Sequence, residues 1–226
     1  HEYLPDTNAA MSGYTLDAFD SLAALIRLSL TAGKPVLCCE YGLHAPGAVL
    51  TRAHLDPGGA HIKHFIWASA AMPFAGPALP WWWEDYIFGR QLDSLWGPLT
   101  GWRSTFYPPS GSTVVWVNNL DDENAAYRLT ALKTKDQAIG YIRAAALSWS
   151  AILDAAERGE QIAPGLVDDV RADIGEISAG EYTVRCIRPV DGELLSEWVI
   201  DHTGGSLVIP LPAFSDDIAF GVIRAR

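Results

Sequence analysis

The sequence predicts two successive fold classes: an α/β segment over residues 1–110 and an antiparallel β-sandwich over residues 111–226. In the first segment, stretches with apolar residues at helical spacing alternate with short runs that are apolar at every position, as strands covered on both faces require. In the second, short runs of β-branched and aromatic residues follow one another between turn signals. The chain is long and apolar enough for this plan, with 226 residues of which 49% are hydrophobic.

Three helices are expected in the first segment. Residues 15–31 place apolar side chains near helical spacing, and Gly33 follows the end. Residues 60–72 combine an apolar face with small residues and stop before Pro73. Residues 92–106 repeat apolar side chains at i, i+3, i+4 and i+7. Helices that alternate with buried strands indicate an α/β unit.

Two strands accompany these helices. Residues 36–39 are apolar at every position, which is typical of a buried parallel strand, and residues 76–83 form the next candidate. The connection that follows the first strand, residues 41–59, is long and rich in Gly, Pro and His. Long loops in compact domains are often functional, so this loop is a candidate functional segment.

The second segment is expected to be antiparallel. Asp191-Gly192 lies between two candidate strands and is a hairpin signal. Residues 144–160 interrupt the pattern with a stretch that is either helical or a loop carrying Trp149. The candidate strands are residues 112–118, 138–143, 166–172, 181–188, 194–201, 206–210 and 217–225.

The acidic balance of the chain limits its partners. A formal net charge of −11 and a pI near 4.8 repel the phosphates of nucleic acids and anionic membrane surfaces, so neither partner is expected. The apolar runs are interrupted by Pro, Gly or charge well before the roughly 20 residues that a bilayer span needs. A neutral substrate fits better, and nine Trp with eight Tyr suit stacking on sugar rings.

The cysteine and histidine patterns argue against a metal or another cofactor. Cys38, Cys39 and Cys186 cannot build a disulfide framework and are expected to be buried free thiols. No CxxC or Cys/His ligand spacing is present. His61 and His64 are one helical turn apart, yet no carboxylate completes an HExxH-type spacing. We therefore expect no cofactor and no metal site.

Glu40 is the first candidate for chemistry. It follows the apolar run of residues 36–39, at the carboxyl end of a predicted parallel strand, where α/β barrels place their catalytic groups. A carboxylate at a strand end is also explained by helix capping or by a salt bridge. Position alone leaves both explanations open.

A run of aromatic residues is the second candidate. In a strand, Trp81 and Trp83 share one face and Trp82 takes the other, so one face packs into the core and the other is available to a sugar ring. Glu84, directly after the run, either hydrogen-bonds sugar hydroxyls or is an exposed loop carboxylate.

These residues resemble a known enzyme family. Lys34-Pro-Val-Leu-Cys-Cys-Glu-Tyr-Gly42 is similar to the seventh-strand motif of clan A retaining glycoside hydrolases, especially the family five cellulase- and mannanase-like enzymes, where an apolar run ends in Glu-aromatic-Gly. His1-Glu-Tyr3 resembles their sixth-strand His-x-Tyr motif, and residues 66–83 resemble the seventh helix and Trp-rich eighth strand of bacterial members. Pro212-Ala-Phe214 and Asp217-Ile-Ala219 match the end of a small β-sandwich that often follows the barrel in these proteins.

The resemblance implies a fold, a site and a location. Residues 1–110 would be the C-terminal part of a (β/α)8 TIM barrel, with the end of strand six and strands seven and eight. Glu40 would be the nucleophile. The residues implied to contact a carbohydrate substrate are His1, Tyr3, Tyr41, Trp81, Trp83 and Glu84. Members of the family with these features are secreted or periplasmic, so the resemblance implies such a location here.

The chemistry of this family needs a second carboxyl group. Retaining hydrolysis uses a nucleophile and an acid/base about 5 to 5.5 Å apart. In clan A the acid/base follows Asn on the fourth strand, and this chain has no Asn-Glu pair, since Glu123-Asn124 is in the reverse order. The sequence therefore predicts the C-terminal part of a retaining β-glycoside hydrolase, inactive without the N-terminal barrel portion of the same protein. The alternative is a noncatalytic carbohydrate-binding or structural protein with a barrel remnant.

Overall fold

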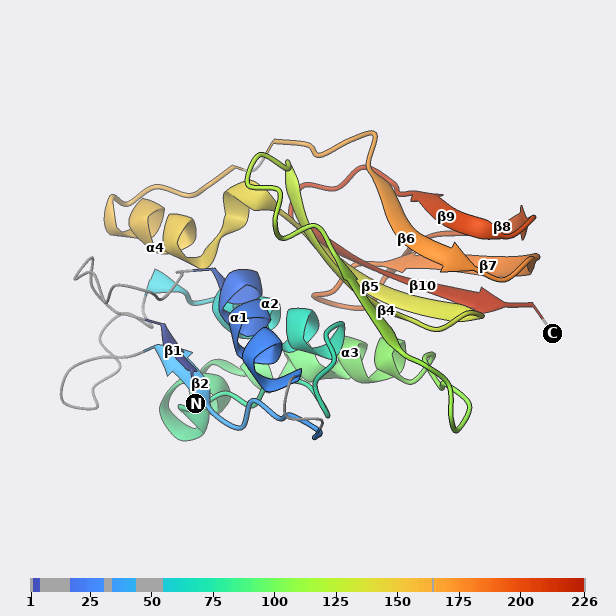
Figure 1. Cartoon of the computed structure of the whole chain (residues 1–226). Helices are drawn as coiled ribbons and strands as arrows, with labels where there is room; N and C mark the ends of the chain where they lie inside the picture. The colour runs from blue at the N-terminus through green and yellow to red at the C-terminus, as the bar shows by residue number, and fades with distance from the viewer. Residues whose placement is uncertain (1, 5–16, 31–33, 44–54, 164, 226) are drawn as a thin grey trace.

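The computed structural model describes residues 2–4, 17–30, 34–43, 55–163 and 165–225 of the chain. We call residues 1–110 the N-terminal region and residues 111–226 the C-terminal region. Figure 1 shows the helices of the N-terminal region against one face of a long antiparallel sheet, with a smaller sheet on the other face. Antiparallel sheets dominate the structure and helices are few. Among the described residues, no helix has the length and apolarity to cross a membrane.

Two helices of the N-terminal region form where the apolar spacing predicts them. Helix α1 (Ala18–Leu30) begins after Asp17, whose carboxylate accepts a hydrogen bond from the Phe19 N–H at 2.8 Å. Helix α2 (Ala60–Ala70) is buried from His61 to its last residue, because it packs between α1 and the antiparallel sheet. A helix with few polar surface positions needs such an enclosed place.

The parallel strands are shorter than expected. Strand β1 (Glu2–Leu4) pairs in parallel with β2 (Tyr41–Leu43), and Tyr3 lies opposite Gly42. The strand predicted at residues 36–39 is absent, and this expectation is wrong. Those residues instead make separate hydrogen bonds to a proline-containing stretch, residues 75–81, such as the one from the Leu79 N–H to the Cys38 carbonyl at 2.9 Å. Pro77 and Pro80 have no N–H to donate, so a regular ladder cannot form.

The aromatic run also departs from the predicted strand at residues 76–83. Tyr41 forms one parallel bridge with Pro80, and the chain then turns, because Trp82 adopts a left-handed conformation with φ 61. A wide helical turn, η2 (Trp83–Ile87), and a short helical turn, η3 (Phe88–Arg90), follow. The prediction that the three tryptophan side chains alternate across a strand is therefore wrong.

The third predicted helix is divided in two. A 3-10 turn, η4 (Leu92–Leu95), leads into α3 (Trp96–Arg103). Pro98 lies in the first turn of α3 and cannot donate a hydrogen bond back to η4, which explains the division. The indole N–H of Trp102 donates to the Phe220 carbonyl at 3.0 Å and so attaches α3 to the sheet.

The C-terminal region contains two antiparallel sheets. The Asp191-Gly192 turn joins β7 (Gly180–Ile187) to β8 (Leu194–His202), as predicted, and Gly192 has φ 77. The sequence did not predict β4, while residues 144–160 contain a 3-10 turn, η5 (Ala145–Leu147), and a helix, α4 (Trp149–Glu157). The larger sheet has the order β3 (Val115–Asn118), β4 (Tyr127–Lys133), β5 (Gln137–Ala144), β10 (Asp217–Arg224), β7 (Gly180–Ile187) and β8 (Leu194–His202), and the smaller pairs β6 (Arg171–Ile177) with β9 (Gly205–Pro210).

Both faces of the large sheet are covered. Ile142 on β5 packs with apolar residues of β6 and β9, whereas its neighbour Tyr141 points to the other face and joins the core of the helices. Alternate residues of one strand therefore enter two different cores. A glycine is required at position 140 of β5, because a Cβ at this position would lie 2.2 Å from the ring of Phe220 on the neighbouring strand β10. The core that contains Tyr141 crosses the predicted domain boundary at residue 110.

Candidate functional site

Glu40 lies directly before β2 and is half-buried. It thus precedes the regular strand instead of ending one, because the hydrogen-bonded stretch begins later than the apolar run predicts. Tyr41, the next residue, is fully buried; its ring stacks on Phe65 at 4.2 Å between centroids, and its hydroxyl donates to the Ile62 carbonyl. The structure therefore places Tyr41 in the core, where packing on α2 accounts for its ring. Tyr41 was predicted to contact the substrate, but it has no exposed surface in this structure.

The tryptophan run lies beside the segment of residues 40–42. A Cβ at Gly42 would come within 3.1 Å of the Trp82 indole and 3.5 Å of the Trp81 Cβ, so the Glu-Tyr-Gly segment and the aromatic run are in direct contact. The Trp81 side chain is 52% exposed. Trp83 is half-buried and its ring lies 5.4 Å from that of Trp96. Of the two tryptophans predicted as a sugar platform, Trp81 presents the open ring and Trp83 packs inward.

The remaining predicted contacts fall into three groups. His1 lies outside the described residues. The backbone of Tyr3 is placed next to Gly42 by the β1–β2 pairing, but its side chain is outside the described part of the structure. Glu84 is exposed in the first turn of η2. The structure thus brings the backbone of Tyr3, Glu40 and Trp81 to neighbouring segments and leaves Glu84 on the surface.

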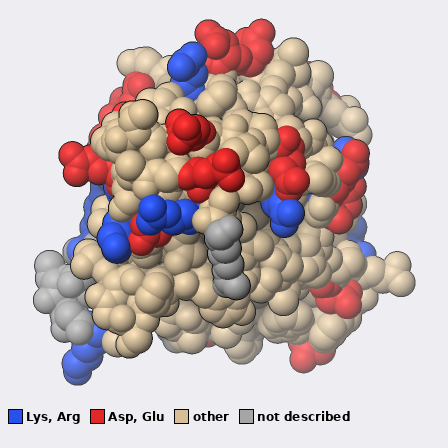
Figure 2. Space-filling view, turned by 90° about the vertical axis from the view of Figure 1, so that its right-hand side faces the viewer, with Lys and Arg blue, Asp and Glu red and all other residues tan. Residues whose placement is uncertain are grey.

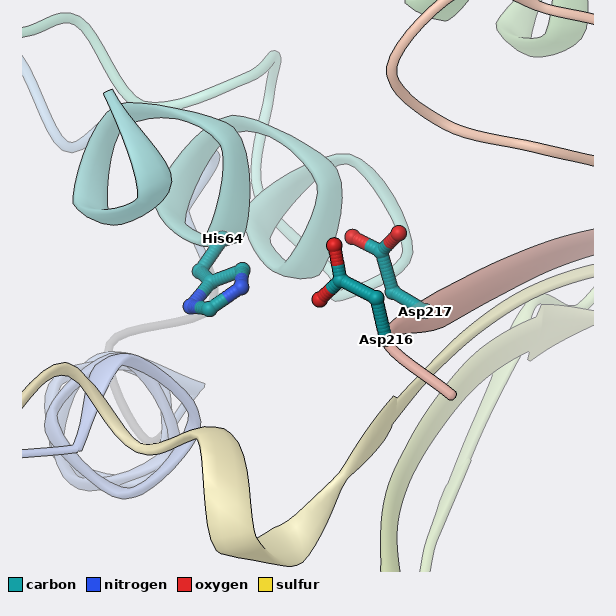
Figure 3. Close-up of side chains that lie close together, drawn as sticks. All are labelled: His64, Asp216 and Asp217. Carbon is teal, nitrogen blue, oxygen red and sulfur yellow. The ribbon is translucent and has the colours of Figure 1, made fainter. Parts of the chain in front are cut away.

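A second polar cluster lies where α2 meets the large sheet, and no sequence pattern indicated it. The Lys63 ammonium on α2 lies 2.6 Å from an Asp216 oxygen and 3.0 Å from an Asp217 oxygen. The Tyr141 hydroxyl donates to Asp217 at 2.8 Å. Lys63 and Asp216 are 153 residues apart, so no local spacing could reveal them. Figure 3 shows His64, on the same helix, beside the two aspartates.

Burial controls the charges of this cluster. Desolvation raises the pKa of Asp217 to about 6, although the Lys63 ammonium opposes the shift. Burial also acts to lower the pKa of Lys63, but the charges of Asp217 and then Asp216 outweigh it and raise that pKa. For His64, burial holds the pKa well below its usual value, and the positive charges of Arg143 and Lys63 add to this effect. His64 is therefore neutral near pH 7.

Asp56 organises the start of α2. Its carboxylate accepts hydrogen bonds from the Ala60 N–H at 2.8 Å and the His61 N–H at 3.1 Å, and it lies 2.6 Å from the His61 Nδ1. Burial acts to raise the pKa of Asp56, but these hydrogen bonds outweigh it and the pKa is lowered. The His61 ring lies between Tyr86 and Trp149, at 5.3 and 4.9 Å between ring centroids. His61 is thus held as a core residue.

Two further features are accounted for by packing. Trp149 is buried, and Trp116 and Trp198 pack against the apolar cores, so these aromatic rings of the C-terminal region serve the interior. Cys38 and Cys186 are buried free thiols as predicted, while Cys39 is exposed, because successive side chains here point to opposite sides. A cavity of about 740 Å³ beside α3 and the β7–β8 hairpin contains none of the predicted site residues.

Comparisons with known proteins give the following findings. No protein-family model matches the chain, and no curated protein matches it either. Similar solved structures are glycoside hydrolases. One described as a glycoside hydrolase has a TM-score of 0.44 at 14% identity, covering 100% of this chain and 51% of that one. A family 5 glycoside hydrolase from Bacteroides vulgatus has a TM-score of 0.46 at 14% identity, covering 99% and 49%.

A glucosidase from Croceicoccus marinus has a TM-score of 0.42 at 11% identity, covering 99% of this chain and 53% of that one. The chain therefore spans about half the length of the solved structures that it resembles.

Proposed function

We propose that this chain carries half of the active site of a retaining β-glycoside hydrolase, with Glu40 as the nucleophile. The observation that carries the proposal is the contact between the Glu40–Gly42 segment and the Trp81–Trp82 segment, beside β1. This contact brings the segment that contains Glu40, which is half-buried, beside the segment that contains Trp81, which is exposed. Carboxylates cleave glycosidic bonds and aromatic rings stack on sugar faces, so these two groups suit a saccharide.

The segment order supports a partial barrel as the scaffold. Strand β1 pairs in parallel with β2, and Tyr41 of β2 bridges in parallel to Pro80. Three successive parallel segments correspond to barrel strands six, seven and eight of the proposed enzyme. Among the described residues β1 pairs with β2 alone, and in this proposal the other edge of β1 pairs with a preceding barrel strand. We assign residues 1–110 to the barrel and residues 111–226 to the following β-sandwich.

The reaction follows from the chemistry of retaining hydrolysis. The Glu40 carboxylate attacks the anomeric carbon of a β-linked sugar and forms a glycosyl–enzyme ester, while a second carboxyl group protonates the leaving oxygen. Water then cleaves the ester with the same second group acting as a base. That acid/base belongs to the N-terminal barrel portion of the same protein in this proposal. The chain by itself is therefore expected to hydrolyse no glycoside.

Labelling of the nucleophile tests this assignment. The full-length enzyme that contains this sequence is treated with an activated 2-deoxy-2-fluoro-β-glycoside, digested and analysed by mass spectrometry for the modified peptide. We expect the label on Glu40, its loss in Glu40→Gln, and its retention in Glu123→Gln, the matched control at an exposed glutamate of the C-terminal region. A label on any other residue would show that the assignment of Glu40 as the nucleophile is wrong.

The alternative function, noncatalytic carbohydrate binding, uses the same exposed ring of Trp81 and needs no second carboxyl group. The two functions separate in the full-length protein. If oligosaccharide binds, Trp81→Ala weakens binding, and the protein neither turns over substrate nor accepts the fluoro-glycoside label, then binding is the function. If the protein hydrolyses substrate and Glu40→Gln abolishes turnover, then the enzyme is the function.

A further inference from the structure

We propose a divalent metal site of the zinc class formed by His64, Asp216 and Asp217, at the junction of α2 with the large sheet. It is separate from the glycosidase proposal, because none of its residues belongs to the Glu40–Trp81 surface. One ring nitrogen of His64 and one oxygen from each carboxylate all lie within 4.8 Å of one another. Figure 3 shows the imidazole extending from α2 toward the carboxylates at the start of β10.

The spacing of the three groups suits a shared ion. Zinc lies about 2.0 to 2.2 Å from imidazole nitrogen and carboxylate oxygen, so two ligands of one tetrahedral ion are about 3.3 to 3.6 Å apart. The three groups lie within 4.8 Å of one another, so rotations of their side chains have to shorten the longest separation by about 1.2 to 1.5 Å to reach that geometry. An imidazole with two carboxylates is a donor set that zinc accepts, whereas magnesium and calcium prefer oxygen alone.

The His64 ring is the observation that points to a ligand. Its side chain is fully buried, and neither ring nitrogen has a hydrogen-bond partner among the described residues. A buried polar atom without a partner costs free energy, so a native protein normally satisfies it.

Lys63 does not occupy the whole site. In the described part of the chain, the ion pairs and hydrogen bonds to the two aspartate side chains all end on Oδ2. The Oδ1 atom of each carboxylate can therefore bind an ion while Lys63 stays in place. One ammonium against two carboxylates leaves one negative charge uncompensated, which favours a further cation.

The site has a route to solvent. A cavity of about 400 Å³ between α2 and α4 is lined by His64 and Asp216, with Glu160 and Gln161 among its other lining residues. Such a cavity admits the ion and holds the water that completes a tetrahedral shell. Because His64 is on α2 and the aspartates lead into β10, the bound ion would join the N-terminal and C-terminal regions.

Zinc titration of the chelator-treated chain tests the proposal. We expect one zinc ion to bind and to raise the Tm by about 5 to 10 °C at a free zinc concentration of ~100 Kd. Magnesium at the same concentration should give no shift. Cobalt(II), used as a spectroscopic probe, should give visible absorption bands that zinc removes by competition.

Variants decide whether these residues hold the ion. His64→Gln and Asp216→Asn should each weaken zinc binding at least tenfold, and His202→Gln, which changes a half-buried histidine on β8 away from the site, should leave it unchanged. Asp216 is half-exposed, so its variant keeps the fold if His64→Gln does not. The proposal is overturned if the wild type shows no zinc-dependent shift, or if Asp216→Asn binds zinc as the wild type does.

Discussion

The two regions of this protein hold their strands in different ways. In the C-terminal region β5 and β10 pair without interruption from Gln137–Ile223 to Arg143–Asp217. In the N-terminal region β1 and β2 pair over three residues, and the next parallel segment adds one bridge. Antiparallel strands find their partners within the C-terminal region, whereas the parallel segments depend on packing against other elements. The large sheet is therefore specified by strand pairing within the C-terminal region, whereas the β1–β2 pair depends on packing against other elements.

The contacts that support the N-terminal region are partly polar and buried. Arg143 on β5 forms an ion pair with Asp17 at the start of α1, and its guanidinium lies 5.1 Å from the centre of the Phe19 ring. The Thr130 hydroxyl on β4 donates to the Ala71 carbonyl after α2 at 3.0 Å. Directional contacts of this kind fix where the helices sit on the sheet. Their loss should affect the N-terminal region more than the C-terminal one.

The largest effect is expected from Arg143→Met. Arg143 is fully buried, and its removal leaves the Asp17 carboxylate without its charged partner, so the free energy of unfolding should fall by about 3 to 5 kcal/mol. Urea denaturation measures this loss. Arg158→Met removes an exposed ion pair with Glu160 and should cost less than about 1 kcal/mol.

Amide hydrogen exchange then compares the two regions in Arg143→Met. Protection should fall in α1 and α2 before it falls in β7 and β10. Equal loss in both regions would contradict the difference drawn between them.

The second effect is a pH dependence that comes from Asp56 on the N-terminal side. Because the pKa of Asp56 is lowered in the folded state, its contribution to stability is full above the ordinary pKa of 3.8 and is lost as the pH falls through the folded value. Asp56→Ala should cost about 2 to 4 kcal/mol at pH 7, and its difference from the wild type should narrow below pH 4. Urea denaturation of the wild type and of Asp56→Ala at each pH measures this difference in the free energy of unfolding. If the difference stays constant down to pH 2, the stabilisation does not come from the ionised Asp56 carboxylate. Asp93→Ala, which changes an exposed aspartate, is the control.

Periodicity in the sequence predicts the elements whose side chains follow one pattern. Helices α1 and α2 and strands β7 to β10 have apolar residues at regular spacing, and they form close to the expected bounds. Strand β4 was missed because polar residues, among them Thr130 and Lys133, interrupt its apolar run. In the fold these two side chains are accommodated by tertiary hydrogen bonds, which the sequence pattern does not reveal.

The candidate site was likewise predicted in part. The resemblance at Glu40 and the tryptophan run identified segments that are in contact, since both lie on neighbouring parallel segments. The expected face of Trp83 was wrong, because the left-handed conformation of Trp82 cannot be read from an aromatic run. The junction of His64 with Asp216 was beyond sequence reasoning, because the fold alone brings them together.

A third, smaller effect is expected at Ser69, which ties the aromatic segment to α2. Its hydroxyl donates to the Phe65 carbonyl at 2.6 Å and accepts from the Ala78 N–H at 2.7 Å, both in the core. Ser69→Ala leaves the buried Ala78 N–H without a partner and should cost about 1 to 2 kcal/mol in urea denaturation. Ser104→Ala, an exposed serine that bonds within its own turn, should be neutral. A cost at Ser104 equal to that at Ser69 would show that burial does not decide the difference.

The smallest effect has the opposite sign and separates backbone from packing. Gly101 lies inside α3 in ordinary helical conformation, and a Cβ there would meet no atom within 4 Å. Gly101→Ala should therefore raise the free energy of unfolding by about 0.5 to 1 kcal/mol, because alanine loses less conformational entropy on folding. Gly111→Ala has equal space but φ 82, so it should destabilise the protein by about 1 kcal/mol. If both variants shifted stability in the same direction in urea denaturation, then free space rather than backbone conformation would govern these positions.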